Sequence, residues 1–431
     1  MKIMQVKKST DEINKNILLG LIVGDALGSP FDGLGKGHIH THFKTIDNYV
    51  DPASALKGKL EKWKKPGFYS SVSQFAIIAG AIKVRDTWTE SFRRYIANSP
   101  EINEYRFGIF RYPDSIEKKF IAGTKEHEPG IEISSQPSVR IIAASMPLSL
   151  KNYSLLEQVG AVISYIRLFT HDVSTAAGAA SVSSLLRYLA REQPPSINYV
   201  QACRECNHQL IEAVDSDPGA IFKNALNPDA LIRELHEMNE ILSRLISIQN
   251  KSEAEAIICA SMNKRLKSPI TRATVNMPLA FIPYTLLIST IHRDDPGALF
   301  HAAMEGGSAA ALTALSAAVR AAVYGSGILP EILVRNLANR KKIMAIVNSL
   351  DNGLIPVALM DEFIQTEASL TRKELEELKA KQKHVKKKPK NELSRTDKES
   401  RLSHYVVESW TKLDKAKWKK EQKKMDKKTR A

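Results

Sequence analysis

Apolar residues recur at intervals of three and four positions in long stretches of this chain, and this spacing constrains the fold more than any other feature. In the stretch 227–248, for example, Leu231, Leu235 and Met238 follow it. Such spacing gathers apolar side chains on one face of a helix, whereas the two-residue alternation of a half-buried strand is scarce here. We therefore predict an all-α fold. The same pattern predicts helices over residues 14–27, 72–84, 154–169, 173–190, 199–215, 227–248 and 309–324.

Small side chains dominate the stretch 309–324, which is almost entirely Ala, Leu, Val and Ser. Aromatic residues make up 7% of the chain and apolar residues 43%, so a sizeable core must form mainly from small and aliphatic side chains. Such helices pack closely inside a compact multi-helix body. Residues 275–291 are also apolar, but Asn276, Pro278 and Pro283 interrupt them, and we predict a buried core helix and no membrane span.

Cysteine content and the start of the chain bear on its compartment. Three cysteines in 431 residues provide no disulfide framework, which favours a reducing, cytoplasmic compartment. The apolar run 17–23 is cut by Asp25, and no small-residue cleavage site follows it. We therefore expect no signal peptide.

The basic charge of the chain lies in its C-terminal part. Residues 371–431 hold 22 Lys/Arg and 10 Asp/Glu, a net charge of +12, which leaves only +3 of the total +15 for residues 1–370. We expect a helical domain over 1–370 and a Lys-rich tail over 371–431 that is partly helical (372–382 and 400–424) or disordered. Lysine clusters attract nucleic acid or an acidic partner, and Tyr405, Trp410 and Trp418 offer rings for stacking on bases. A solvated tail explains the same composition.

Four segments, in order along the chain, resemble the motifs of one family. Residues 20–30 read Gly-Leu-Ile-Val-Gly-Asp-Ala-Leu-Gly-Ser-Pro, and residues 67–74 read Gly-Phe-Tyr-Ser-Ser-Val-Ser-Gln. A Thr-His step at 170–171 precedes an alanine-rich stretch, and residues 306–311 read Gly-Gly-Ser-Ala-Ala-Ala. Arg140 matches the arginine of a further motif. Together they resemble the ADP-ribosylglycohydrolase family, which includes the dinitrogenase reductase-activating glycohydrolases and the crystallin J1 proteins.

The resemblance implies the family's all-helical fold and a site in which two acidic clusters hold a pair of Mg²⁺ ions beside ADP-ribose. Mg²⁺ prefers oxygen ligands that include carboxylates, and a two-metal site orients the attacking water. Asp32 matches an acid that some members use near the metal, but one carboxylate cannot hold two dications. The family's four acidic positions fall on Ser71, Val72, Ser308 and Ala310, and the threonines beside them fall on Ser70, Ser73, Ala309 and Ala311.

We therefore expect a catalytically degenerate relative, a pseudoenzyme that binds a ligand or serves as a scaffold, with no bound metal and no cofactor. Asp32 is the one weak catalytic candidate. ADP-ribose or a nucleotide-like molecule is the expected ligand, because backbone N–H groups at the helix starts near Ser71 and Gly307 can bind phosphate without a metal. The pocket implied by the family's motif positions is lined by Asp25, Asp32, Ser70, Ser71, Val72, Arg140, His171, Gly306, Gly307, Ser308 and Ala310.

Two alternatives stay open at this point. The first is an active hydrolase of ADP-ribosyl glycosidic bonds with a rearranged site, which would use Asp32 together with Glu126, Glu128 and Glu132. The second is a nucleic-acid-binding adaptor in which the basic tail makes the contacts.

Three histidines, His38, His40 and His42, alternate along the chain after a glycine-rich turn. In an extended segment they would face one side, where neutral imidazoles bind Zn²⁺ or Ni²⁺. No cysteine or acidic spacing supports such a site, and we favour a solvated loop.

Two further patterns admit a functional and a structural interpretation. Cys203 and Cys206 with His208 resemble half of a zinc site, but no second half follows, and we favour packing in the core. Thr170 and His171 stand at a helix boundary, where Thr170 can cap the following helix and His171 can bond a backbone carbonyl.

Overall fold

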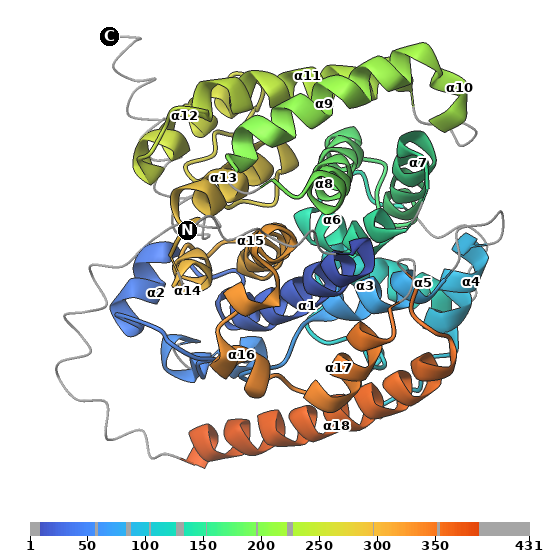
Figure 1. Cartoon of the computed structure of the whole chain (residues 1–431). Helices are drawn as coiled ribbons and strands as arrows, with labels where there is room; N and C mark the ends of the chain where they lie inside the picture. Colours follow the sequence, from blue (N-terminus) through green and yellow to red (C-terminus); the bar gives the residue numbers. More distant parts are fainter. Residues whose placement is uncertain are drawn as a thin grey trace, which may run out of the picture. The chain divides into compact units, whose positions relative to one another are not determined.

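The computed structural model describes residues 9–56, 59–82, 88–102, 105–125, 133–151, 153–194, 197–221, 227–295, 297–350 and 354–387. Within these ranges the chain is helical, and backbone pairing of the β type is limited to isolated bridges such as Gly35–Gly306. The prediction of an all-α fold is confirmed (Figure 1). The α-helices are α1 (Thr10–Gly28), α2 (Lys36–His42), α3 (Ser71–Ala81), α4 (Trp88–Ala97), α5 (Ser115–Lys125), α6 (Val139–Ser145), α7 (Leu155–Ile166), α8 (Val173–Glu192), α9 (Tyr199–Ser216), α10 (Pro218–Ile221), α11 (Pro228–Leu245), α12 (Lys251–Asn263), α13 (Pro278–Ile291), α14 (Ala298–Ala303), α15 (Ala309–Tyr324), α16 (Glu331–Arg335), α17 (Arg340–Asn348) and α18 (Ala358–Lys387).

The chain divides into one compact unit, Met1–Ala380, and a second unit, Lys381–Ala431. Of the second unit the structure describes residues 381–387, which form the end of α18. Several residues named from the sequence lie outside the described ranges, so their proposed roles stay predictions. They are Glu126, Glu128, Glu132, Tyr405, Trp410 and Trp418.

Helices α1 and α15 pack closely against each other and run through the middle of the first unit (Figure 1). A Cβ atom added at Gly24 would lie 2.2 Å from the carbonyl oxygen of Thr313, and one at Gly28 would lie 2.2 Å from that of Ala309. The Thr313 hydroxyl donates a hydrogen bond to the Gly24 carbonyl at 2.6 Å. The two backbones approach so closely that no side chain fits at these glycines, which explains both the glycine spacing of α1 and the small residues of α15.

Helix α13 is enclosed by other helices, and its residues from Pro278 to Thr290 are buried. This confirms the prediction of a buried core helix over this stretch. The interruption by Pro283 is tolerated inside α13. None of the helices in the described ranges is both long and apolar enough to cross a bilayer.

Helix α18 is anchored to the segment that leads into α3. Arg111 is 1% exposed, and its guanidinium donates to Glu367 of α18 at 2.6 Å and to the Tyr69 carbonyl at 3.1 Å. The Arg111 backbone N–H donates to the Gln74 side chain at 2.8 Å, and the Ser71 N–H donates to the Arg111 carbonyl at 2.7 Å. These bonds fix the start of α3, where the motif serines lie.

The histidine segment differs from its expected form. His38, His40 and His42 lie in helix α2, not in an extended loop. On a helix, His38 and His42 share a face one turn apart, and their rings meet edge to face with centroids 4.6 Å apart. His40 points elsewhere on the helix surface and is exposed. The three imidazoles therefore do not face one side together.

Candidate functional site

Asp25, near the end of α1, is a buried carboxylate that holds the start of α3. It accepts hydrogen bonds from the backbone N–H groups of Ser70 and Ser73, at 2.9 and 3.1 Å. The hydroxyls of the same two serines each donate to it at 2.7 Å, and the Ser29 hydroxyl donates at 3.1 Å. A carboxylate is stable there because it faces the positive end of α3 and its orphan N–H groups.

Asp32 lies directly after a short 3-10 turn, η1 (Ser29–Phe31), that continues α1. Its Oδ2 atom accepts from Arg140 Nη1 at 2.9 Å and from Lys64 Nζ at 3.3 Å, and its Oδ1 atom accepts from the Ala310 N–H at 3.4 Å. Burial by itself raises the pKa of Asp32, but Lys64 and Arg140 outweigh burial and leave that pKa below its ordinary value. Asp32 is thus a carboxylate already neutralised by two cations.

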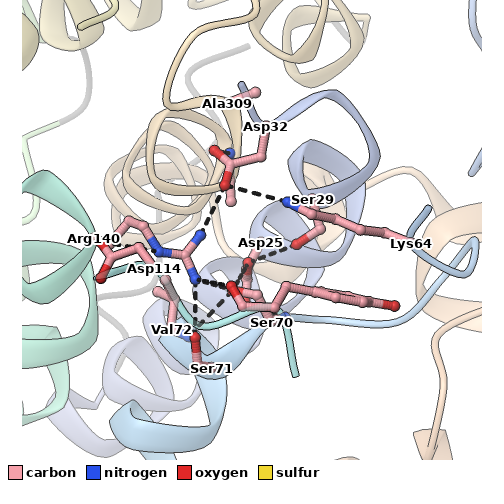
Figure 2. A network of polar contacts seen from close by, with 12 residues as sticks. Asp25, Ser29, Asp32, Lys64, Ser70, Ser71, Val72, Asp114, Arg140 and Ala309 are labelled. Atoms are coloured by element: carbon pink, nitrogen blue, oxygen red, sulfur yellow. Dashed lines mark hydrogen bonds and ion pairs between the residues drawn. The ribbon is translucent and has the colours of Figure 1, made fainter. Parts of the chain in front are cut away.

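Arg140, in α6, is 5% exposed and joins the motif serines to Asp32, as Figure 2 shows. Its Nη2 atom donates to the Ser71 hydroxyl at 2.9 Å and to the Ser70 hydroxyl at 3.3 Å. The guanidinium also pairs with Glu117 at 3.2 Å. Burial raises the pKa of Glu117 to about 7, although the adjacent Arg140 opposes that rise. Five of the six oxygen atoms that accept hydrogen bonds from Arg140 belong to side chains, and the sixth is the Tyr112 carbonyl.

The loop between α14 and α15 forms the other side of this cluster. Gly306 and Gly307 have φ angles of +69° and +66°, which favour glycine. A Cβ atom at Gly306 would lie 2.3 Å from the Leu34 carbonyl oxygen, and one at Gly307 would lie 2.4 Å from that of Thr274. The Gly307 N–H donates to the Leu34 carbonyl at 2.9 Å, so this loop and the loop after η1 are joined. The start of α15 is thereby held next to Asp32.

The helix starts that we expected to present free N–H groups use those groups within the protein. At α3, the Ser71 N–H donates to the Arg111 carbonyl at 2.7 Å, and the Val72 N–H donates to the Ser70 hydroxyl at 3.2 Å. At α15, the Ser308 N–H donates to the Thr274 carbonyl at 2.9 Å. The Ala310 N–H faces Asp32. A phosphate at the start of α3 would have to replace one of these bonds.

The expected pocket residues are brought together with one visible exception. Asp25, Asp32, Ser70, Ser71, Val72 and Arg140 form the cluster of Figure 2, with the start of α15 beside them. His171 is exposed, and its backbone N–H donates to the Ser134 carbonyl at 2.7 Å.

The capping role given to Thr170 was wrong. Asp172 caps α8, because its side chain accepts from the Thr175 N–H at 2.7 Å. The Thr170 hydroxyl instead donates to the Gln136 carbonyl at 2.7 Å. The cap is two residues closer to the helix than the motif suggested.

Three residues of the cluster were missed from the sequence. Lys64 lies in a Lys-Trp-Lys-Lys run that resembles a solvated surface, and Glu117 lies on α5, far from any motif. Asp114 is 3.9 Å from Arg140 Nε. Only the fold brings these residues to Arg140, and no local signal marks them.

The cysteines are buried thiols, and no second pair of metal ligands follows Cys203 and Cys206 in the sequence. Cys203, Cys206 and Cys259 are free and buried. Burial raises the pKa of Cys203 and of Cys206 to about 12, so both stay protonated at neutral pH. His208 is exposed on α9. This agrees with packing in the core.

The family model of the ADP-ribosylglycohydrolases matches this chain over residues 10–361. The chain therefore belongs to the ADP-ribosylglycohydrolase family, whose members are typically metal-dependent. Among solved structures it is similar to one titled "ADP-ribosylglycohydrolase-related protein complex", with 15% sequence identity and a TM-score of 0.47. That similarity covers 79% of this chain and 96% of the other. A comparison with curated proteins gave no match.

Proposed function

We propose that this chain is a catalytically degenerate member of its family, a binding or scaffold protein that does not carry out magnesium-dependent hydrolysis. One observation carries the proposal. The four acidic positions of the family motifs hold Ser71, Val72, Ser308 and Ala310, and Asp32, which matches the family's further acidic position, is paired with Lys64 and Arg140.

The residues present do not suit a pair of Mg²⁺ ions. Val72 and Ala310 are fully buried and offer no side-chain oxygen. The Ser71 hydroxyl donates to Glu117 at 2.8 Å and accepts from Arg140. Asp25 already accepts five hydrogen bonds from serines. A dication at Asp32 would meet two cationic side chains in a nearly dry site, where repulsion between like charges is strong.

Binding of ADP-ribose, or of a nucleotide-like ligand, without metal is the activity that we propose for this cluster. The Lys64 side chain is 13% exposed and that of Asp32 is 16% exposed, so this pair forms the solvent-facing edge of the cluster. The ammonium group of Lys64 provides positive charge for a diphosphate at that edge. The ligand then displaces part of the Lys64–Asp32 pairing and needs no metal to offset its charge.

The first test is a calorimetric titration of ADP-ribose into the full chain, with and without Mg²⁺, beside hydrolysis assays on N- and O-linked ADP-ribosyl substrates. We expect the same affinity in both conditions and no hydrolysis. Lys64→Met should weaken binding, whereas Lys62→Met, an exposed lysine two residues away, should leave it unchanged.

Two results would revise this proposal. Binding that requires Mg²⁺, or hydrolysis that Asp32→Ala abolishes, would support the alternative of an active hydrolase with a rearranged site. Absence of binding in both conditions would contradict the proposed ligand and would leave only the scaffold role.

A further inference from the structure

A second group of potential ligand atoms lies outside this cluster, at the turn that joins α13 to α14. It consists of His292, directly after α13, Asp295 in the turn, and His301 in α14. Asp295 Oδ2 lies 3.6 Å from His292 Nδ1 and 3.2 Å from His301 Nε2. One ligand atom from each of the three residues lies within 4.8 Å of the others.

Hydrogen bonds to neighbouring groups hold His292 and Asp295 in place. The other carboxylate oxygen of Asp295, Oδ1, accepts from the Gly297 N–H at 2.7 Å, which leaves Oδ2 directed at the imidazoles. Arg320, which is 1% exposed, donates to the His292 carbonyl at 2.5 Å and to the Asp295 carbonyl at 3.0 Å. Two ligands are therefore positioned by backbone contacts before any ion arrives, and this reduces the entropy lost on binding.

The donor set favours one class of cation. Two imidazole nitrogens and one carboxylate oxygen suit Zn²⁺ and related transition-metal ions, whereas Mg²⁺ prefers oxygen ligands alone. Donors about 2.0–2.2 Å from one ion lie roughly 3.3 Å from each other in a tetrahedral site. The two measured separations from Asp295 Oδ2, 3.6 and 3.2 Å, already match that spacing.

The two histidines differ in their surroundings. The His292 ring directs Nδ1 at Asp295, and its buried Nε2 atom has no hydrogen-bond partner among the described residues, so no protein group there fixes the ring through its second nitrogen. The His301 side chain is 52% exposed and can rotate to close the site, with water as a remaining ligand. Lys251 and Arg320 place positive charge near His292, and this limits the affinity of the site for a cation.

We propose that His292, Asp295 and His301 bind a divalent transition-metal ion of the Zn²⁺ type. This site is separate from the Asp32–Arg140 cluster and does not depend on the function proposed for it. The bound ion would join the end of α13 to α14. Because α14 ends at Ala303, the ion would also stabilise the following loop, which contains Gly306 and Gly307.

The test is a titration of the full-length chain with Zn²⁺ alone against a competing chelator, and with Co²⁺ alone to observe its absorption bands. We expect the wild type to bind one ion. We expect His301→Ala and Asp295→Asn each to bind it at least about tenfold more weakly, with an unchanged circular dichroism spectrum. The control is the double variant His38→Ala with His42→Ala, which removes the pair on α2 and should bind as the wild type does.

Two outcomes would overturn the proposal. One is an affinity in His301→Ala equal to that of the wild type. The other is a loss of binding in the α2 double variant alone, which would place the ion at His38 and His42. A bound ion should also raise the melting temperature of the wild type by more than that of His301→Ala, because a tighter ligand stabilises the folded state more at the same concentration.

Discussion

The Arg140 guanidinium donates hydrogen bonds to two carboxylates, two serine hydroxyls and a backbone carbonyl, and a third carboxylate, Asp114, lies 3.9 Å away. A charge in such surroundings is stable only while its partners remain, since removing one partner leaves the others buried and unpaired. At the scale of single residues, this cluster is therefore more sensitive to loss of charge than to loss of volume.

We predict that Arg140→Met lowers the free energy of unfolding by about 3–5 kcal/mol, because it leaves Glu117 without its cation and Asp32 with Lys64 alone. Urea denaturation followed by circular dichroism measures the loss. Arg335→Met is the control, because its pair with Glu331 is exposed and should contribute nothing measurable. A loss in Arg140→Met as small as in the control would contradict the role that we assign to this guanidinium.

Helix packing sets the behaviour of α1 and α15 at the scale of elements. We predict that Gly24→Ala destabilises the protein by about 3 kcal/mol or more, because the added Cβ meets backbone atoms of α15 that cannot move independently. Thermal and urea denaturation measure the loss. In Gly160→Ala, on α7, the added Cβ has nothing within 4 Å, and this variant should be slightly more stable than the wild type. Equal stability of the two variants would show that α1 and α15 are less tightly packed than described.

Helix α18 carries a buried acid whose titration affects stability. Burial raises the pKa of Glu374 from 4.5 to about 7, although Arg111 opposes that rise. The folded state therefore holds this proton more tightly than the unfolded state, and the contribution of Glu374 to the free energy of unfolding falls as the pH rises from about 4.5 to about 7.

We predict that Glu374→Gln loses less stability than the wild type between about pH 5 and about pH 8, by roughly 2–3 kcal/mol. Urea denaturation of both proteins at the two pH values gives the difference. Glu376→Gln is the control, because Glu376 is exposed on the same helix. The same pH dependence in the wild type and in Glu374→Gln would contradict the assignment.

At the scale of the whole molecule, the residues of α18 beyond position 370 contribute to the stability of the fold. Thr371 accepts from Arg111 at 3.3 Å and donates to the Ile109 carbonyl at 3.0 Å, and Glu374 accepts from the Lys65 N–H at 3.1 Å. We predict that a chain ending at residue 370 is markedly less stable than one ending at 387, because only the shorter chain loses these buried partners.

The chain that ends at residue 387 lacks the rest of the basic tail but keeps the whole of α18. If the tail binds nucleic acid, as its lysines suggest, a chain ending at residue 387 should lose that affinity and its dependence on salt while its melting temperature stays unchanged. Fluorescence anisotropy with a labelled oligonucleotide at several salt concentrations measures both. Affinity retained by the truncated chain would place nucleic-acid binding elsewhere.

The sequence by itself determined the fold class and the family. Helical spacing identified the stretches that became α1, α8, α9, α11 and α15, because a helix buries one face and so repeats its apolar residues at a fixed interval. The glycines at 24 and 28 and the pair at 306–307 were recognisable because close backbone contact and positive φ angles exclude other residues. The absence of carboxylates at Ser71, Val72, Ser308 and Ala310 was also visible, since it depends on residue identity alone.

Only the tertiary structure decided which charges meet. Lys64 and Glu117 come from segments far from any motif, and nothing local distinguishes them from the exposed lysines and glutamates around them. The histidines of α2 alternate in sequence, yet helix geometry brings only His38 and His42 together and turns His40 away, while His292 and His301 meet across a turn. Residue types and periodicity are properties of the chain, but the distance between charges far apart in sequence is set by how helices pack.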